Sequence, residues 1–175
     1  GGGGMIITDN EKLAAKAKHL TTQAKQAGIE YYHNEVGYNY RLVNVLAAIG
    51  VAQMEQLPSF LTRKKEIRDI YFDGLGKIGD IEFQKTEKDV NPNWWMFTIK
   101  TSKKESMIKV LNENGLQSRS LWIPMNKLPM FRNYLYINNQ NISEELYKTC
   151  LSIPCSTNIK DEELRSVVNT IKKQY

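Results

Sequence analysis

Apolar residues recur at helical spacing in the stretch that follows Arg41. The repeating positions lie three or four residues apart: Leu42, Val45, Leu46, Ile49 and Ala52. Small residues, Ala47, Ala48 and Gly50, fill the positions between them. A helix that is apolar on nearly all sides is typically buried. The pattern therefore predicts a helix over 42–57 that another protein surface covers.

A second helical pattern begins after Pro58. Proline lacks an amide donor and restricts the residue before it, so we expect Leu57-Pro58 to break or kink the helix. The apolar face of the second helix comprises Leu61, Ile67, Ile70, Tyr71 and Leu75. Gly74, Gly76 and Gly79 are expected to end it.

The N-terminal region predicts one strand and one helix. Residues 5–8, MIIT, form a short apolar run that is typical of a buried strand. Asp9 or Asn10 is expected to cap a helix over 11–27. Gly28 is a suitable residue to end that helix.

From residue 81 onwards, shorter elements alternate between strand and helix. Strands are expected at 81–83, 94–100, 116–122 and 151–154, and helices at 103–114, 143–150 and 161–173. This alternation predicts a small α/β sandwich with an antiparallel or mixed sheet. The glycines at 76 and 79 mark the expected boundary between this domain and the helical region before it.

Length and composition suit one domain of ordinary size, or slightly more. The 175 residues are 41% hydrophobic and carry a net charge of +5. The basic residues are interleaved with acidic ones, whereas a nucleic-acid binder more often shows a basic stripe. A basic cleft for a phosphorylated ligand is compatible with this charge. No apolar run reaches the length of a membrane span.

The cysteines and histidines indicate no metal or disulfide framework. Cys150 and Cys155 are expected to be free thiols in a reducing cytoplasm. His19 and His33 are far apart in the sequence, and no Cys/His cluster accompanies them. The sequence therefore predicts no zinc site.

Residues 37–41, GYNYR, gather hydrogen-bond donors beside a glycine and directly before the apolar helix. Asn39 supplies an amide, Tyr38 and Tyr40 supply hydroxyls, and Arg41 supplies a guanidinium with five donors. Such groups suit a phosphate. The plainer interpretation is an aromatic loop that leads into a core helix.

Two further segments combine aromatic and polar residues. The segment NPNWWMF places Trp94 and Trp95 side by side in a predicted strand, where neighbouring side chains point to opposite faces. One indole can then pack in the core while the other lines a cavity or an interface, although burial of both is the plainer interpretation. The segment SRSLWIPMNKLPMF joins Arg119 and Trp122 in a loop stiffened by two prolines.

These segments together resemble the DegT/DnrJ/EryC1/StrS family of sugar aminotransferases, which use pyridoxal phosphate (PLP). GYNYR with its apolar helix, the R-x-x-W-x-P-M segment and the closing LSIPCSTNIKDEEL all fit the family. The opening GGGGMIITDN, which alone would read as a linker, resembles the turn and strand after the family's Schiff-base lysine.

The resemblance implies an α/β fold, the C-terminal portion of a fold-type-I PLP transferase. Residues 1–57 would be the tail of the large PLP-binding domain, with its strand, helix, GYNYR loop and buried helix. Residues 58–79 would form the interdomain helix. Residues 80–175 would form the small C-terminal α/β domain.

The resemblance also implies roles for residues near the helix start. In the family, the asparagine of this motif reaches across a homodimer to the cofactor phosphate of the other subunit, a cofactor-binding role that falls to Asn39. Tyr38 and Arg41 would lie at the substrate side of the active-site rim. An ion pair at the interface is the alternative for Arg41.

In the small domain, the resemblance implies that Trp95, Arg119 and Trp122 bind substrate. Trp95 would lie near the sugar nucleotide. Arg119 would meet either the diphosphate of the sugar nucleotide or the carboxylate of the amino donor.

The implied parent is a cytoplasmic enzyme of polysaccharide biosynthesis. It would convert a nucleotide-linked 4-keto-6-deoxy sugar, UDP-linked as in the bacillosamine and legionaminic acid branch, to the 4-amino sugar, with glutamate as donor. The family's Schiff-base lysine has no counterpart here and is expected upstream of Gly1, so we expect no catalytic residue in this chain and no activity of the chain alone. A non-catalytic binding or scaffolding module derived from the same fold is the alternative.

Overall fold

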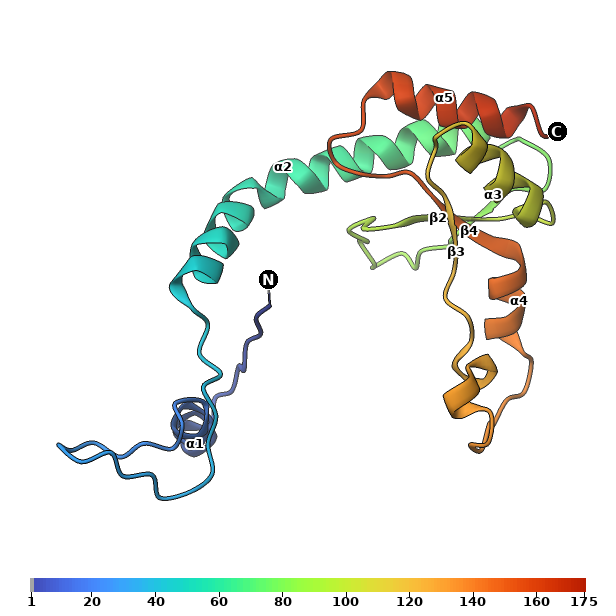
Figure 1. Ribbon diagram of the computed structural model, residues 1–175. Helices are drawn as coiled ribbons and strands as arrows, with labels where there is room; N and C mark the ends of the chain where they lie inside the picture. Colours follow the sequence, from blue (N-terminus) through green and yellow to red (C-terminus); the bar gives the residue numbers. More distant parts are fainter. Residues whose placement is uncertain (1) are drawn as a thin grey trace. The chain divides into compact units, whose positions relative to one another are not determined.

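The computed structural model describes residues 2–175. They belong to two compact units, one ending at Leu57 and the other spanning Pro58–Tyr175. Helix α2 runs over Asn44–Leu75 and contributes residues to both units (Figure 1). Residues 58–75 group with the second unit because Ile67 and Tyr71 lie in its core. The division into 1–57, 58–79 and 80–175 stays a prediction.

The first unit contains helix α1, Glu11–Thr21. Of the two expected caps, Asn10 is the one used: its side-chain oxygen accepts from the backbone N–H groups of Lys12 and Leu13 at 3.0 and 3.1 Å. The helix ends before the expected residue 27, because Gln23 and Ala24 adopt φ of +66° and +51°. Left-handed backbone of this kind cannot continue a right-handed helix.

The strand expected at residues 5–8 is not formed. Met5, Ile6 and Ile7 are 84%, 70% and 85% exposed. An isolated strand leaves its backbone donors and acceptors without partners. The described part of the first unit offers no other strand to pair with it.

Helix α2 is not broken at Pro58, which was one of the two expected outcomes there. It continues without interruption through Pro58. Proline costs about 3 kcal/mol inside a helix, and the packing of Ile67, Tyr71 and Leu75 in the core favours the continuous form. Its N-terminal turns are exposed in the single chain, since Val45 and Met54 are 71% and 66% exposed and no described residue covers them. The covering of these turns by a partner chain stays a prediction.

The second unit is built on a four-stranded antiparallel sheet with the order β1-β2-β4-β3. The strands are β1 Glu82–Phe83, β2 Phe97–Lys100, β3 Arg119–Ser120 and β4 Cys150–Ile153. The helices are α3 Lys104–Glu113, α4 Ile142–Thr149 and α5 Asp161–Lys172, with short 3-10 helices η1 Met125–Lys127 and η2 Pro129–Phe131. The expected α/β class is confirmed.

The core lies between the sheet and the helices α2, α3 and α5 (Figure 1). Alternation along the strands turns Phe97 and Ile99 toward the helices, and the same holds for Leu151 and Ile153. Helix α5 contributes residues at the spacing of one helix face: Leu164, Val167, Val168 and Ile171.

Three strands are shorter than expected, and β1 lacks only residue 81. Strand β2 begins at Phe97 rather than at residue 94, because Trp94 adopts a φ of +53°. Strand β3 keeps only two of the seven residues expected over 116–122. Both cysteines are free thiols, Cys150 buried and Cys155 half-buried. Within residues 2–175, no helix has the length and apolar character needed to cross a bilayer.

Candidate functional site

The GYNYR segment lies against the end of helix α1. The Tyr38 N–H donates to the Leu20 carbonyl at 2.8 Å, and the Tyr40 N–H donates to the Thr21 carbonyl at 3.1 Å. A Cβ atom on Gly37 would lie 2.5 Å from the backbone nitrogen of Ala24. Only glycine permits this approach, so Gly37 fixes how the segment docks on the helix.

The side chains of this segment are exposed. The rings of Tyr38 and Tyr40 stack, with centroids 5.2 Å apart and planes inclined by 14°. Asn39 and Arg41 are also exposed. Their side chains form no hydrogen bond or ion pair with any described residue. The amide and guanidinium donors are therefore available to an external acceptor.

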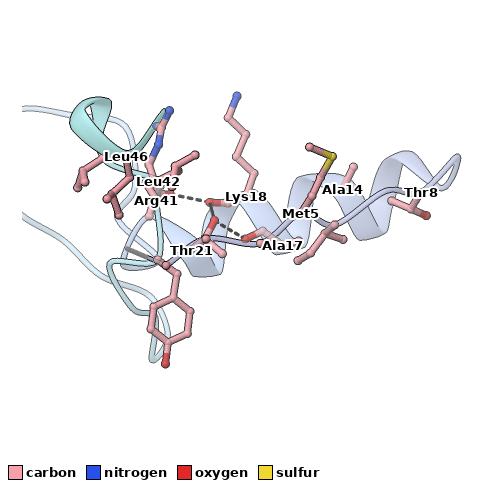
Figure 2. Close-up of a pocket in the computed structure, with 16 residues that line it drawn as sticks. Met5, Thr8, Ala14, Ala17, Lys18, Thr21, Arg41, Leu42 and Leu46 are labelled. Atoms are coloured by element: carbon pink, nitrogen blue, oxygen red, sulfur yellow. Dashed lines mark hydrogen bonds between the residues drawn. The ribbon is translucent and has the colours of Figure 1, made fainter. Parts of the chain in front are cut away.

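A groove of about 1000 Å³ opens beside this segment within the first unit. It is lined by the glycine run, by one side of α1 and by residues 40–43 and 46. Figure 2 shows the side chains of Lys18 and Arg41 extending in the same direction from this groove. None of the described residues that line the groove carries a carboxylate, so the two cations favour an anionic ligand. Sequence reasoning missed Lys18, because one lysine on a polar helix face carries no motif.

In the second unit, the two adjacent indoles have different environments. Trp94 is 9% exposed and packs edge-on against Phe72, with centroids 5.8 Å apart. Trp95 is 69% exposed. The plainer interpretation, burial of both indoles, is therefore wrong. The two indoles point apart because of the positive φ of Trp94 and not because of alternation in a strand. A bulky residue in this conformation costs about 1–3 kcal/mol, and such strain tends to occur at functional sites.

Arg119 lies on β3, whose start is held by a side chain of α3. The Ser118 N–H donates to the Asn112 side-chain oxygen at 3.0 Å, and the Asn112 amide donates to the Ser118 carbonyl at 3.1 Å. Arg119 pairs with Ser152 of β4, and its side chain is exposed. The Asn112 side chain thus satisfies both backbone polar groups of Ser118, as a neighbouring strand would.

The loop after β3 carries Trp122, which is 71% exposed. Lys127 in this loop forms an ion pair with Glu144 of α4 at 2.9 Å. The hydrogen bond from Lys127 lowers the pKa of the Glu144 carboxyl. Because the pair is partly exposed, it orients the loop more than it stabilises the fold.

The candidate residues thus fall into two groups, one in each unit. The first unit holds Tyr38, Asn39 and Arg41, and the second holds Trp95, Arg119 and Trp122. Within each group the side chains are exposed and carried by short, well-anchored segments. Their binding roles stay predictions. Among residues 2–175, no three His, Cys, Asp or Glu side chains gather closely enough to hold a metal ion.

Known proteins resemble almost the whole chain. The family model of the DegT/DnrJ/EryC1/StrS aminotransferases matches residues 1–172. EpsN of Bacillus subtilis is 29% identical over 97% of this chain and 45% of its own length. GDP-perosamine synthase of Escherichia coli O157:H7 is 30% identical over 100% of this chain and 48% of its own length. A UDP-4-amino-4,6-dideoxy-N-acetyl-beta-L-altrosamine transaminase of Campylobacter jejuni is 29% identical over 99% of this chain and 50% of its own length.

The chain therefore spans about half the length of the curated relatives it matches. Solved structures agree on the fold. DesV of S. venezuelae superposes with a TM-score of 0.84 at 20% identity, over 96% of this chain and 45% of that one. PseC of Helicobacter pylori superposes with a TM-score of 0.83 at 16% identity, over 96% of this chain and 47% of that one. PseC is an aminotransferase involved in the biosynthesis of pseudoaminic acid.

The match over 1–172 confirms the resemblance read from GYNYR, from R-x-x-W-x-P-M and from the closing segment. The chain belongs to the DegT/DnrJ/EryC1/StrS aminotransferase family, whose members depend on PLP.

Proposed function

We propose that this chain is part of an enzyme that converts a nucleotide-linked 4-keto-6-deoxy sugar to the corresponding 4-amino sugar, with glutamate as the amino donor. The observation that carries the proposal is the family match over residues 1–172. PLP, when bound, supplies the chemistry that moves the amino group between donor and acceptor. The residues of this chain hold and orient the reactants.

The GYNYR segment fits the phosphate of the cofactor. Its amide, hydroxyl and guanidinium groups are exposed, and Gly37 holds the segment against α1. In the proposed homodimer, the Asn39 amide donates to the cofactor phosphate of the other subunit. Hydrogen bonds to a dianion are stronger than those to a neutral group. Tyr38 and Arg41 take the substrate side of the same rim.

The second unit supplies the surfaces for the sugar nucleotide. The exposed indoles of Trp95 and Trp122 offer flat apolar faces for a sugar or a base. The Arg119 guanidinium suits a planar, bidentate anion. Both the diphosphate of the substrate and the carboxylate of glutamate meet that requirement, so Arg119 serves one of these two groups.

The nucleotide is proposed to be UDP. The second candidate is GDP, because GDP-perosamine synthases of three bacteria align with the chain at 26–30% identity. The two candidates share the sugar chemistry and differ in the base. An assay that offers both nucleotide sugars to the same enzyme separates them.

We also propose that the chain alone is inactive and that the enzyme is a homodimer. None of the lysines in the chain lies in a context that matches the family's Schiff-base lysine. The apolar side chains of α2 that are exposed here, such as Val45, Ile49 and Met54, would form part of the dimer contact.

The test is product formation by the enzyme with PLP, glutamate and a 4-keto-6-deoxy sugar linked to UDP or GDP. Mass spectrometry is expected to detect the amino sugar with the UDP substrate, and only when PLP is present. Amination of the GDP sugar alone would transfer the proposal to the second candidate. Absence of amination with both sugars would refute the proposed reaction.

A further inference from the structure

Both backbone polar groups of Trp95 are held by side chains. Its N–H donates to the side-chain oxygen of Asn93 at 3.0 Å, and its carbonyl accepts from the Lys64 ammonium at 2.9 Å. The indole of the same residue is 69% exposed. The main chain is therefore anchored at a position where the side chain projects into solvent.

Lys64 uses its whole donor capacity at this junction. An ammonium group has three N–H donors. Here it faces three acceptors: the Trp95 carbonyl, the Cys155 carbonyl and the Cys155 sulfur, the last at 3.6 Å. It forms no ion pair with a described carboxylate. The Lys64 ammonium thus joins the main chain at Trp95 to the main chain at Cys155.

The residue before Trp95 adds to this arrangement. Trp94 has a φ of +53°, and its ring is packed against Phe97, with centroids 5.9 Å apart. The Arg68 guanidinium lies 5.6 Å from the centroid of the same ring. Strained backbone of this kind persists only where the surroundings over-determine it. The bend at Trp94 sends one indole into the core and the next one outward.

We infer that Lys64 and Asn93 are positioning residues, which hold the Trp95 indole as a preorganised surface for stacking on a planar ring of the nucleotide sugar. The inference rests on the proposed function for the identity of the ligand. Preorganisation matters because ordering a mobile side chain during binding weakens affinity. Helix α2 is a rigid support for the lysine, since Ile67 and Tyr71 fix the helix in the core.

Fluorine NMR of the enzyme labelled with 5-fluorotryptophan tests the positioning role. The chain contains three tryptophans, and the variant Trp95→Phe assigns the resonance of Trp95. In Lys64→Met, this resonance is expected to move away from its position in the parent enzyme, while those of Trp94 and Trp122 stay in place. Lys64→Arg is expected to restore it. Lys65→Met, which removes the neighbouring exposed ammonium, is the matched control and is expected to change nothing.

An unchanged Trp95 resonance in Lys64→Met would overturn the inference. If Lys64→Met does not fold, all three resonances move together, and Asn93→Ala at the exposed turn decides instead. A shift of the Trp95 resonance alone in Asn93→Ala supports the inference, and an unchanged one refutes it.

Titration with UDP-N-acetylglucosamine and GDP-mannose tests the stacking role. The Trp95 resonance is expected to respond to at least one of them, and Lys64→Met is expected to bind that ligand up to about tenfold more weakly. A Trp95 resonance that responds to neither ligand refutes the stacking role. Product formation in the separate assay would then show that the proposed reaction stands while the inference fails. Stacking without product formation would show that the inference stands while the proposed reaction fails.

Discussion

The Tyr175 hydroxyl donates a hydrogen bond to the Asp80 carboxylate across 95 residues of sequence. The same carboxylate accepts from the Thr101 hydroxyl and from the Ser102 N–H, each at 2.7 Å. The hydrogen bonds from Ser102, and then that from Tyr175, hold the pKa of Asp80 far below its usual range. The Tyr175 ring also covers Gly79, where a Cβ atom would lie 2.0 Å from the ring. This contact joins the end of the chain to the start of β1.

The first prediction concerns the pH dependence of stability. Because the pKa of Asp80 is lower in the folded state, its contribution is fully present above the unfolded pKa of about 3.9 and is lost as the pH falls below it. Asp80→Asn is therefore expected to lower the melting temperature at neutral pH and to flatten its decline below about pH 4. Thermal unfolding across pH measures both effects. Asp73→Asn, at an exposed carboxylate with no described partner, is the control. Parallel pH profiles for Asp80→Asn and the parent would contradict the prediction.

The second prediction concerns Gly37. In Gly37→Ala, the new methyl group would meet the backbone of Ala24 and Gln23 at 2.5 and 2.6 Å. The variant is expected to lose about 1–3 kcal/mol of stability, as is typical of overpacking. Gly50→Ala is the matched control, because nothing lies within 4 Å of its added Cβ and alanine favours a helix interior by about 0.5–1 kcal/mol. Urea unfolding compares the two, and equal effects would show that close approach is not the reason for Gly37.

The third prediction separates cofactor binding from stability. Asn39→Ala removes an exposed amide with no described side-chain partner, so the melting temperature of the cofactor-free enzyme is expected to hold. Loss of one hydrogen bond to a charged group, worth about 1.5–3 kcal/mol, is expected to weaken PLP binding about tenfold to a hundredfold.

Asn10→Ala provides the opposite pattern to that of Asn39→Ala. It removes the cap of α1 and is expected to cost about 1 kcal/mol of stability without changing PLP affinity. Spectrophotometric titration with PLP and thermal unfolding measure the two quantities. An unchanged PLP dissociation constant in Asn39→Ala would show that the cross-subunit role belongs to another residue.

The fourth prediction concerns the support of Arg119. Asn112→Ala leaves both backbone groups of Ser118 without these partners, and Ser118 is 5% exposed. A buried polar group left without a hydrogen bond costs about 1–3 kcal/mol. Urea unfolding is expected to show this loss for Asn112→Ala and less than about 0.5 kcal/mol for Asn114→Ala, an exposed asparagine near the end of the same helix. In the proposed enzyme, the KM for the anionic reactant that Arg119 meets is also expected to rise. Equal stability of the two variants would show that the hydrogen bonds between Asn112 and Ser118 do not stabilise the fold.

The fifth prediction concerns the exposed apolar face of α2. Ile49 is 55% exposed there, one turn after Val45, which is 71% exposed. An apolar patch of this kind drives association, so the protein is expected to sediment as a dimer and Ile49→Glu as a monomer. Val90→Glu places the same charge at a residue that is 56% exposed in a loop of the second unit, and it is expected to leave the dimer intact. A monomeric parent at high concentration would count against the proposed interface.

Much of the second unit could be read from the sequence, because local periodicity decides which side of an element faces the core. Leu164, Val167, Val168 and Ile171 recur at the helical period, and Phe97 and Ile99 alternate as strand residues do. Both sets are buried in the structure. The donors of GYNYR and the three indoles were also identified, since their chemistry lies in the side chains themselves. Which indoles are exposed was not.

Tertiary structure alone decided the features that depend on distant partners. Residues 5–8 have strand composition but no described neighbour to pair with, and α2 passes Pro58 because its later turns are packed in the core. Lys64 is separated by 31 residues from the Trp95 carbonyl and by 91 from Cys155. In the sequence, Asn112 is one of several polar residues on a helix, and only the fold shows that it bonds the backbone of Ser118. Hydrogen bonds of this kind have no period along the chain, because they form only when the fold brings a side-chain donor or acceptor to a particular backbone group.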